Sequence, residues 1–202
     1  MTGRTAIIAA KSQDRSYLPG ISRRDFCRRT GVGVTAAALA PLWATDLLAS
    51  DPSTPAFRAL SFQHLHTGES LSVEYVQAGS YVREALSAID HVLRDHYSGD
   101  VHPIDPELLD ILHAVALETG TRSPFRVISG YRSPATNEML RRNGRGAARN
   151  SMHLKGKAID IRLDDVDTAT LRDVGLALGR GGVGYYEKSD FVHLDTGRVR
   201  RW

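Results

Sequence analysis

Two histidines and one aspartate stand at spacings that would suit a metal site. His153 and Asp160 are seven residues apart, with Gly156 between them, and His193 follows further along the chain. Each of them alone would more simply be a core or surface residue. Together, two imidazoles and one carboxylate leave a fourth position open on a zinc ion, as in catalytic rather than structural zinc sites. The set therefore predicts a catalytic zinc centre at His153, Asp160 and His193.

Two predicted strands would position these side chains. Residues 158–163 and 191–195 both alternate between apolar and polar side chains, as half-buried strands do. The alternation places Asp160 on the same face of the first strand as Ala158 and Arg162. It places His193 and Asp195 together on one face of the second strand. If the two strands are neighbours, Asp160 and His193 converge, and a loop that turns back into the first strand adds His153.

The motifs around these residues resemble those of a known family. Residues 151–160 match the pattern Ser-x-His-x-x-Gly-x-Ala-x-Asp, and residues 129–133 read Ser-Gly-Tyr-Arg-Ser. Both patterns resemble the zinc peptidoglycan peptidases related to D-Ala-D-Ala carboxypeptidases, which are M15-like peptidases. The resemblance implies a hedgehog/DD-peptidase-like fold and a zinc ion, Zn²⁺. It also implies hydrolysis of peptide cross-links or stem peptides of peptidoglycan.

Further motifs are similar to those of the twin-arginine-exported murein endopeptidase branch of this family. Gly-Val-Gly-Tyr-Tyr occupies residues 182–186, Phe-Val-His-x-Asp-x-Gly occupies residues 191–197, and the chain ends in Trp202. The likeness spans about residues 58–202. It favours an endopeptidase over a carboxypeptidase, with murein as the substrate.

The resemblance also suggests residues that would bind substrate. The Arg that matches Arg132 binds substrate or stabilises the tetrahedral oxyanion in the family, a role that suits its fixed donors; the simpler alternative is a surface salt bridge. Ser151 lacks a base–orienter pair beyond the proposed zinc ligands, so we expect it to bond within its loop or to substrate rather than to act as a nucleophile. Tyr131, Tyr185, Tyr186 and Trp202 are further candidates for the cleft, or else core aromatic residues.

The general base has two candidates. Many relatives carry a Glu three residues before the last His ligand, a position that Asp190 occupies here. Strand alternation instead favours Asp195, which shares its face with His193, and we prefer Asp195. Either carboxylate could alternatively orient a ligand imidazole.

The periodicity of the remaining chain predicts a single α+β domain with an antiparallel sheet and helices packed on one side. Predicted strands are residues 58–65, 71–76, 125–129, 158–163, 183–186 and 191–195, and predicted helices are residues 80–97, 105–117, 134–142 and 167–178. His64 and His66 are interpreted as structural or rim residues. The loop at 143–157 carries a run of Lys and Arg that is either solvated or a cationic rim for acidic stem peptides.

The net positive charge of the chain lies in its first 50 residues. They hold seven Lys or Arg and three Asp or Glu, a surplus larger than the whole chain's net charge of +3. The rest of the chain is therefore slightly acidic, which argues against nucleic-acid binding. The only cysteine, Cys27, also lies in this segment, so a processed protein would offer no thiolate ligand and no disulfide.

This leader resembles a twin-arginine export signal. Arg23 and Arg24 precede Phe26 and an uncharged run at residues 30–45. That run is shorter than the roughly 20 residues that span a bilayer comfortably, so an uncleaved membrane anchor is the lesser alternative. We expect residues 1–50 to be a signal peptide, residues 51–57 a linker and residues 58–202 the peptidase domain. The expected protein is a periplasmic monomer that meets the twin-arginine translocation machinery only during export.

Two other functions are compatible with the same motifs. The chain could be a non-catalytic peptidoglycan-binding module that keeps the peptidase fold, or a protein in which zinc only stabilises the fold. A pure binder has no need of a complete His–Asp–His set together with Arg132, which favours the enzyme.

Overall fold

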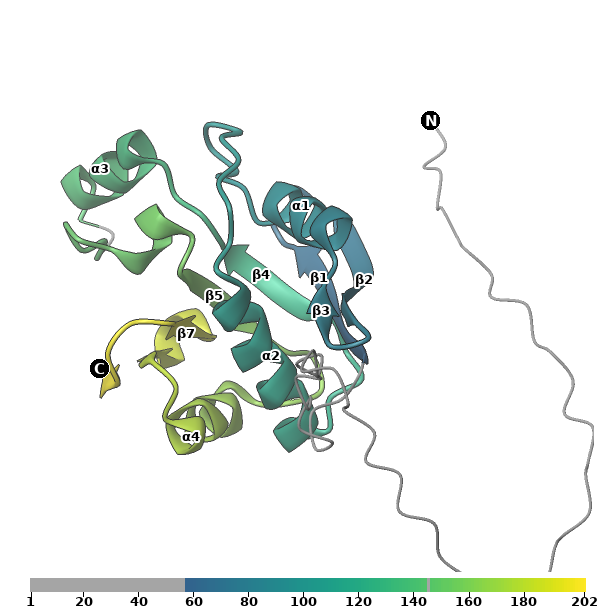
Figure 1. Ribbon diagram of the computed structural model, residues 1–202. Coiled ribbons are helices and arrows are strands. Elements are labelled where there is room, and N and C mark those ends of the chain that lie inside the picture. Colours follow the sequence, from purple (N-terminus) through teal and green to yellow (C-terminus); the bar gives the residue numbers. More distant parts are fainter. Residues whose placement is uncertain (1–56, 145) are drawn as a thin grey trace, which may run out of the picture. The chain divides into compact units, whose positions relative to one another are not determined.

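The computed structural model describes residues 57–144 and 146–202 (Figure 1). This part of the chain confirms the α+β class. Its helices are α1 Arg83–Val92, α2 Pro106–Thr119, α3 Pro134–Arg142 and α4 Thr168–Leu178, with 3-10 turns η1 Met152–Lys155 and η2 Glu187–Ser189. Its strands are β1 Phe57–His64, β2 Ser70–Gln77, β3 Ser80–Tyr81, β4 Phe125–Ser129, β5 Ala158–Arg162, β6 Gly182–Tyr186, β7 Phe191–Asp195 and β8 Arg200–Arg201.

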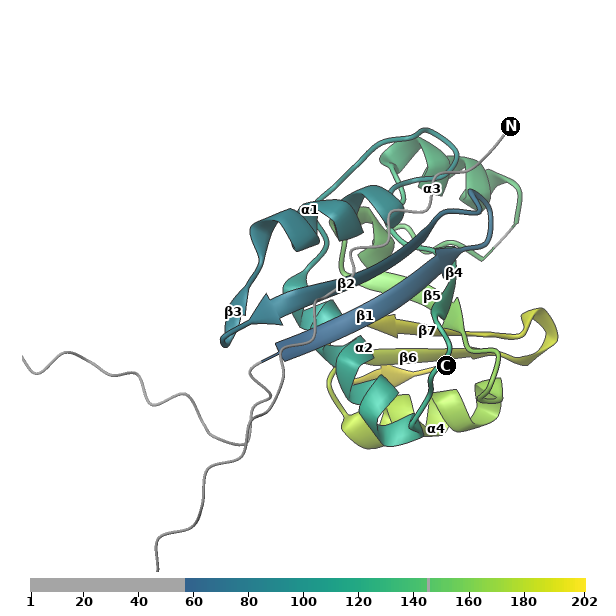
Figure 2. The ribbon, with the colours of Figure 1, turned by 90° about the vertical axis from the view of Figure 1, so that its right-hand side faces the viewer.

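The strands form one sheet in the order β3-β2-β1-β4-β5-β7-β6-β8, and Figure 2 shows its central strands side by side. The sheet is mostly antiparallel, as predicted, but β1 pairs with β4 and β6 pairs with β8 in parallel. The first parallel pair follows from its long connection, which contains α1 and α2 and returns the chain to the end where β1 began. The second arises because β8 joins the edge of β6 that the β6–β7 hairpin leaves free.

The sheet separates the hydrophobic core from the site. Ile159 and Leu194 face a core to which α1, α2 and α4 all contribute buried residues. Helix α4 lies so close to the sheet that a Cβ on Gly175 would come within 2.9 Å of the Leu194 side chain. Because side chains alternate along a strand, Asp160 and His193 point to the opposite face. The prediction that helices cover one side therefore holds for this core face.

A bulge in β4 changes which of its side chains lies on the face that carries Asp160 and His193. Val127 pairs with Ile161, whereas Ser129 pairs with Asp160, so β4 has one residue more than β5 over this interval. An extra residue shifts the alternation of the following side chain. Ser129 thereby joins Asp160 on the site face, three residues before Arg132.

Helix α1 is shorter than the predicted helix at residues 80–97. Ala78 and Gly79 adopt positive φ angles of 49° and 76°, and this turn folds Ser80–Tyr81 back onto β2 as strand β3. The helix ends at Val92. Beyond it, the buried Asp95 carboxylate accepts hydrogen bonds from backbone N–H groups of the next turn and of Ser133, and thereby holds the chain in a loop.

Side-chain caps mark the N-termini of the other three helices. The Asp105 carboxylate caps α2 by accepting from the Glu107 N–H, and Gly120 ends this helix with a φ of 65°. Ser133 and Asp167 cap α3 and α4 in the same way. These caps fix where the loops that carry the site begin.

The N-terminal expectations fall largely outside the described residues. Strand β1 begins at Phe57, the last residue assigned to the linker. The predicted export signal at residues 1–50 lies outside the described part of the chain. Among the residues that are described, no helix combines the length and apolarity that crossing a membrane requires.

Candidate metal centre

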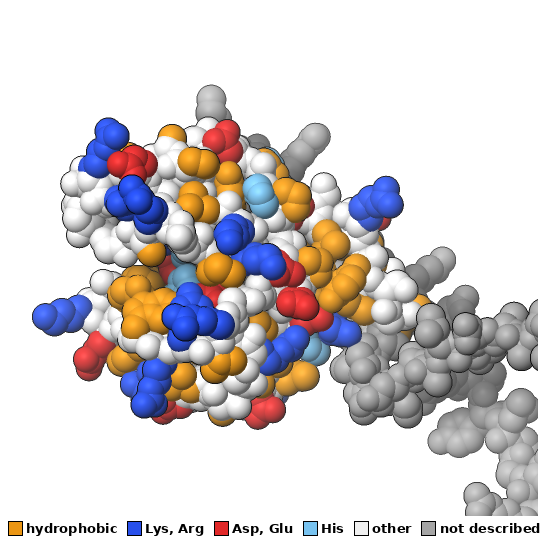
Figure 3. All heavy atoms as spheres, turned by 60° about the vertical axis from the view of Figure 1, so that its left-hand side comes forward, with side chains coloured by type: hydrophobic (Ala, Val, Ile, Leu, Met, Phe, Trp, Pro, Cys, Tyr) orange, Lys and Arg blue, Asp and Glu red, His pale blue; other side chains and the backbone are white. Residues whose placement is uncertain are grey.

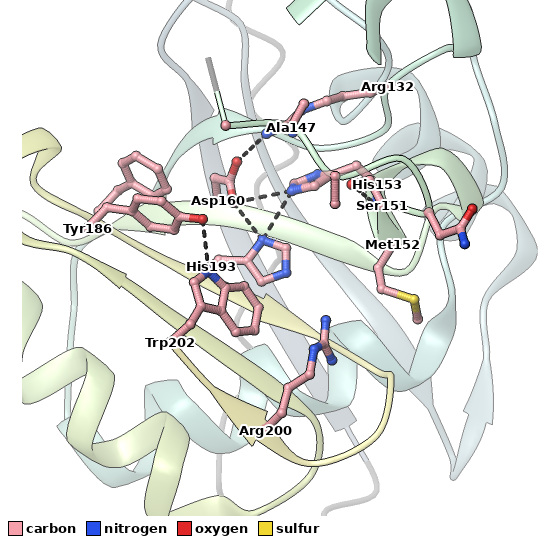
Figure 4. Close-up of a pocket in the computed structure, with 14 residues that line it drawn as sticks. Arg132, Ala147, Ser151, Met152, His153, Asp160, Tyr186, His193, Arg200 and Trp202 are labelled. Atoms are coloured by element: carbon pink, nitrogen blue, oxygen red, sulfur yellow. Dashed lines mark hydrogen bonds and ion pairs between the residues drawn. The ribbon is translucent and has the colours of Figure 1, made fainter. Parts of the chain in front are cut away.

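The three predicted ligands converge on one point, as Figure 4 shows. Asp160 Oδ1 lies 2.8 Å from His193 Nδ1 and 3.2 Å from His153 Nε2, and the two nitrogens are 3.1 Å apart. All three residues are buried. Among residues 57–144 and 146–202, they are the one group of three or more His, Cys, Asp or Glu whose ligand atoms lie close enough to share a metal ion.

Two local structures bring these side chains together. In the β5–β7 ladder Asp160 pairs directly with His193, so both project from the same face. His153 lies in η1, where the Ser151 hydroxyl caps the turn by accepting from the His153 N–H. Gly156 then ends η1 with a φ of 64°, packed so closely against Pro103 that a side chain would collide with it. The glycine between the two predicted ligands is therefore required by the turn.

In each imidazole, the ring nitrogen that points away from Asp160 (the outer nitrogen) lies beside a hydrogen-bond acceptor. His153 Nδ1 lies 2.6 Å from the Gly130 carbonyl oxygen, and His193 Nε2 lies 2.9 Å from Asp195 Oδ2. These acceptors place the imidazole protons on the outer nitrogens, so His153 Nε2 and His193 Nδ1 both present lone pairs to the Asp160 carboxylate. Three electron-rich atoms that face one another repel unless a cation lies among them. This donor set fits a bound Zn²⁺.

The ionisation of His153 and Asp160 also suits a cation, whereas at His193 a metal ion would have to displace a proton. Burial lowers the pKa of His153 and so favours the neutral imidazole that metals bind. Burial also lowers the pKa of His193, but the hydrogen bonds to Asp160 and Asp195 outweigh it and the pKa is raised overall. For Asp160, burial raises the pKa, but the interactions with His153 and His193 lower it by more. The pKa is therefore lowered overall, and the carboxylate stays ionised.

Arg132 lies at the site, as predicted. Its Nη2 donates to Asp160 Oδ2, and its Nε donates to the Ser129 hydroxyl at 2.8 Å. Ser129 reaches this position through the β4 bulge. The salt bridge that was the alternative interpretation of Arg132 therefore exists, but it is made within the metal centre and fixes the guanidinium beside the cavity.

The two candidate bases occupy different surroundings, and neither lines the cavity. Asp190 is exposed and contacts Thr168 and Arg162. The Asp195 side chain is fully buried: Oδ2 receives His193 Nε2 and Arg200 Nη2, while Oδ1 accepts from Arg200 Nη1 and from two backbone N–H groups. With both oxygens occupied, Asp195 is placed to orient His193, which favours the orienting role over the base. Its assignment as the base stays a prediction.

A cavity of about 190 Å³ opens onto the metal centre. In Figure 3 it is a cleft with histidine and acidic side chains in its floor. Besides the three predicted ligands, its lining comes from the loop after β4, from the segment that leads into η1 and from the C-terminal part of the sheet: Arg132, Gly146, Ala147, Ala148, Asn150, Ser151, Met152, Tyr186, Phe191, Arg200 and Trp202.

Two of the four aromatic candidates for the cleft line the cavity. Tyr131 is buried, stacks on His102 and lines neither the cavity nor the groove described below. Tyr186 and Trp202 form the wall instead. The Trp202 Nε1 donates to the Tyr186 hydroxyl at 2.9 Å, so the hydroxyl proton remains available for a bound ligand.

Arg200 is a site residue that the sequence did not single out. It pairs with Asp195 and its guanidinium lies 4.8 Å from the centre of the Trp202 ring. The basic loop at 143–157 does not supply the cavity's cations among the described residues. Arg141 and Arg142 pair with Glu138, and Arg132 and Arg200 are the cations in the lining. The sequence of residues 198–201, with three arginines in four positions, was the one signal for Arg200.

Comparison with known proteins identifies the family to which this chain belongs. A model of an M15-type peptidase family matches residues 52–202. The chain belongs to this family, whose description is Peptidoglycan L,D-endopeptidase MepK. The resemblance stated from the motifs is thus confirmed.

The alignments with two curated relatives cover most of each protein. Peptidoglycan L,D-endopeptidase MepK of Escherichia coli K12 is 41% identical over 182 residues, which is 90% of this chain and 97% of that protein. Probable peptidoglycan L,D-endopeptidase MepK of Haemophilus influenzae is 43% identical over 151 residues, 74% of this chain and 81% of that protein. The crystal structure of Serratia marcescens L-Ala D-Glu endopeptidase ChiX aligns with a TM-score of 0.36 at 19% identity, over 55% of this chain and 86% of that one.

Proposed function

We propose that this protein is a zinc-dependent peptidoglycan L,D-endopeptidase that acts in the periplasm. The observation that carries the proposal is the convergence of His153, Asp160 and His193 in an open cleft, in a chain that belongs to this peptidase family. A non-catalytic wall-binding module is the weaker alternative, because simple binding does not require three buried ligand atoms or the guanidinium fixed beside them.

Hydrolysis adds water across the peptide bond: the carbonyl carbon gains a hydroxyl group and the amine nitrogen gains a proton. Zn²⁺ held by His153 Nε2, Asp160 Oδ1 and His193 Nδ1 would polarise the carbonyl and lower the pKa of a bound water towards about 7. The Gly130 carbonyl and the Asp195 carboxylate keep both imidazoles in the tautomer that this requires.

Two further side chains would act on the substrate. The Arg132 guanidinium, fixed by Asp160 and Ser129, has N–H groups beyond those already bonded, and these can stabilise negative charge as it develops on the carbonyl oxygen. The Tyr186 hydroxyl accepts from Trp202 and so can donate its own proton to the bound peptide. Both groups are held before the substrate arrives, which lowers the cost of reorganisation.

The direct test is digestion of purified sacculi by the zinc-loaded chain, with and without a chelator. Soluble cross-link cleavage products should appear with zinc, disappear with the chelator and return when zinc is restored. Sacculi that bind the protein but release no products under any of these conditions would favour the binding module. Analysis of the released peptides by mass spectrometry would identify the L,D bond.

Export is proposed on the basis of the sequence alone. Replacing Arg23 and Arg24 by Lys keeps the charge but removes the paired guanidinium groups of the signal. Precursor should then accumulate in the cytoplasm, as measured by fractionation and immunoblotting, whereas Arg28→Lys serves as a control within the same leader. Undiminished periplasmic protein in the double variant would contradict this route.

A further inference from the structure

A second groove begins where the metal-centre cavity ends. Arg132, Asp160 and Phe191 line both, so the two hollows meet at the metal centre and extend from it in different directions. The groove has a volume of about 350 Å³. The rest of its lining is His66, His96, Tyr97, Ile128, Ser129, Thr136, Leu140 and Ser189.

A pair of histidines far apart in sequence forms one wall of this groove. The His66 and His96 rings stack with their centres 4.2 Å apart and their planes 7° from parallel. His66 lies in the β1–β2 turn, and His96 follows α1. Tyr97 continues the wall, with its ring 4.3 Å from that of His96. The sequence interpretation treated His66 as a structural or rim residue; the structure places it on the rim and adds His96.

Buried groups behind the wall hold it in place. His64 Nδ1 accepts the backbone N–H groups of His66 and Thr67, and Asp95 accepts that of Tyr97. The His64 ring is buried, and burial lowers its pKa to about 4, so the ring is neutral with its proton on Nε2. That Nε2 has no hydrogen-bond partner. An unpaired buried donor costs stability, so the cluster is not explained by packing alone.

The chemistry of the groove suits an anionic peptide. Apart from Asp160, which Arg132 and the metal centre already engage, no carboxylate is found in its described lining. His66, His96 and Tyr97 offer polar ring atoms and aromatic faces, and Arg132 adds a positive charge. Peptidoglycan stem peptides carry free carboxylates, which such donors bind.

We propose that this groove binds the second stem peptide of a cross-linked substrate, with a carboxylate of that peptide at His66, His96 and Arg132. The inference rests on the proposed endopeptidase function and gives it a structural basis. An endopeptidase must accommodate peptide on both sides of the scissile bond, and here a hollow extends from the metal centre on each side. One stem peptide would lie by Trp202 and Arg200, and the other by His66 and His96.

The test measures equilibrium binding of two probes to the zinc-loaded full chain. The first probe is a cross-linked muropeptide dimer whose cross-link amide is replaced by a non-hydrolysable methylene-amine. The second is the corresponding uncross-linked muropeptide. In the double variant His66→Ala/His96→Ala, the dimer should bind about tenfold more weakly, as expected for the loss of one or two hydrogen bonds, and the monomer about as well as before.

Two further variants separate binding from folding. His91→Ala removes an exposed histidine from α1 that lines neither hollow, and it should bind both probes normally. His96→Phe keeps an aromatic ring for stacking but loses the ring nitrogens, so it should weaken dimer binding without lowering the melting temperature. Unchanged dimer affinity, or equal weakening for both probes, would overturn the groove assignment while leaving the peptidase proposal intact. A wild-type chain that binds neither probe would contradict the peptidase proposal itself.

Discussion

His153→Ala and His193→Ala are each expected to abolish both stoichiometric zinc binding and hydrolysis. Each substitution removes one of three ligand atoms that lie within 3.2 Å of one another, and the two remaining atoms cannot complete the site. Because the metal's Lewis acidity supplies several kcal/mol, hydrolysis of sacculi should fall by about three orders of magnitude or more. Elemental analysis of the dialysed variants and product release from sacculi provide the two measurements.

A matched control removes an imidazole elsewhere. His91→Ala should keep one zinc per chain and full activity, because this side chain is exposed and outside the cavity. Circular dichroism would establish that all three variants are folded. If His153→Ala or His193→Ala retained a full equivalent of zinc, that residue would not be a ligand.

Asp195→Asn is expected to weaken zinc binding by about 10- to 100-fold, the usual effect of losing a partner that orients a ligand. An amide in this position would direct an NH₂ group at the His193 Nε2–H, or at the backbone N–H groups and Arg200 if it were flipped. In either arrangement, N–H donors face each other. The His193 imidazole would avoid this contact by moving its proton to Nδ1, the atom that faces the metal. Calorimetric zinc titration measures the affinity directly.

Activity at saturating zinc separates orientation from general-base catalysis. If Asp195 orients His193, most of the activity of Asp195→Asn should return when zinc is added in excess. A general base would instead leave zinc affinity unchanged and cost about two to four orders of magnitude at any zinc concentration. Asp190→Asn, a substitution of the same type at an exposed side chain outside the cavity, should change neither quantity. A large loss in Asp190→Asn alone would assign the base to Asp190.

The sequence by itself predicted the candidate ligand set and determined the strands that carry it. Strand periodicity and the spacing of His153, Asp160 and His193 are local properties, because alternation decides which residues share a face. Helix caps such as Asp105 and Ser133 are likewise local, since each carboxylate or hydroxyl bonds to an N–H two or three residues away. For this reason the α+β class, three of the four helices and the converging ligands follow from the chain read in order.

Tertiary structure decided which groups surround the ligands. Asp195 belongs to the same strand face as His193, as alternation indicated. Whether its oxygens are free depends on Arg200, on the Gly197 N–H and on the Gly182 N–H of the neighbouring strand β6. Tyr131 is adjacent to Arg132 in the motif, yet it packs against His102 and stays out of the cavity. Hydrogen-bond partners from distant segments leave no periodic signal in a sequence.

The stacked rings of His66 and His96 are the clearest feature of the structure that the sequence could not predict. His66 and His96 are separated by thirty residues, and each alone is an ordinary surface histidine. They stack because Asp95 ties the loop after α1 to the Ser133 N–H, and because Arg94 in that segment pairs with Glu69 at the end of the β1–β2 turn. Strand order and loop anchoring depend on the whole fold, so the sequence alone could predict the candidate metal ligands but not the groove beside them.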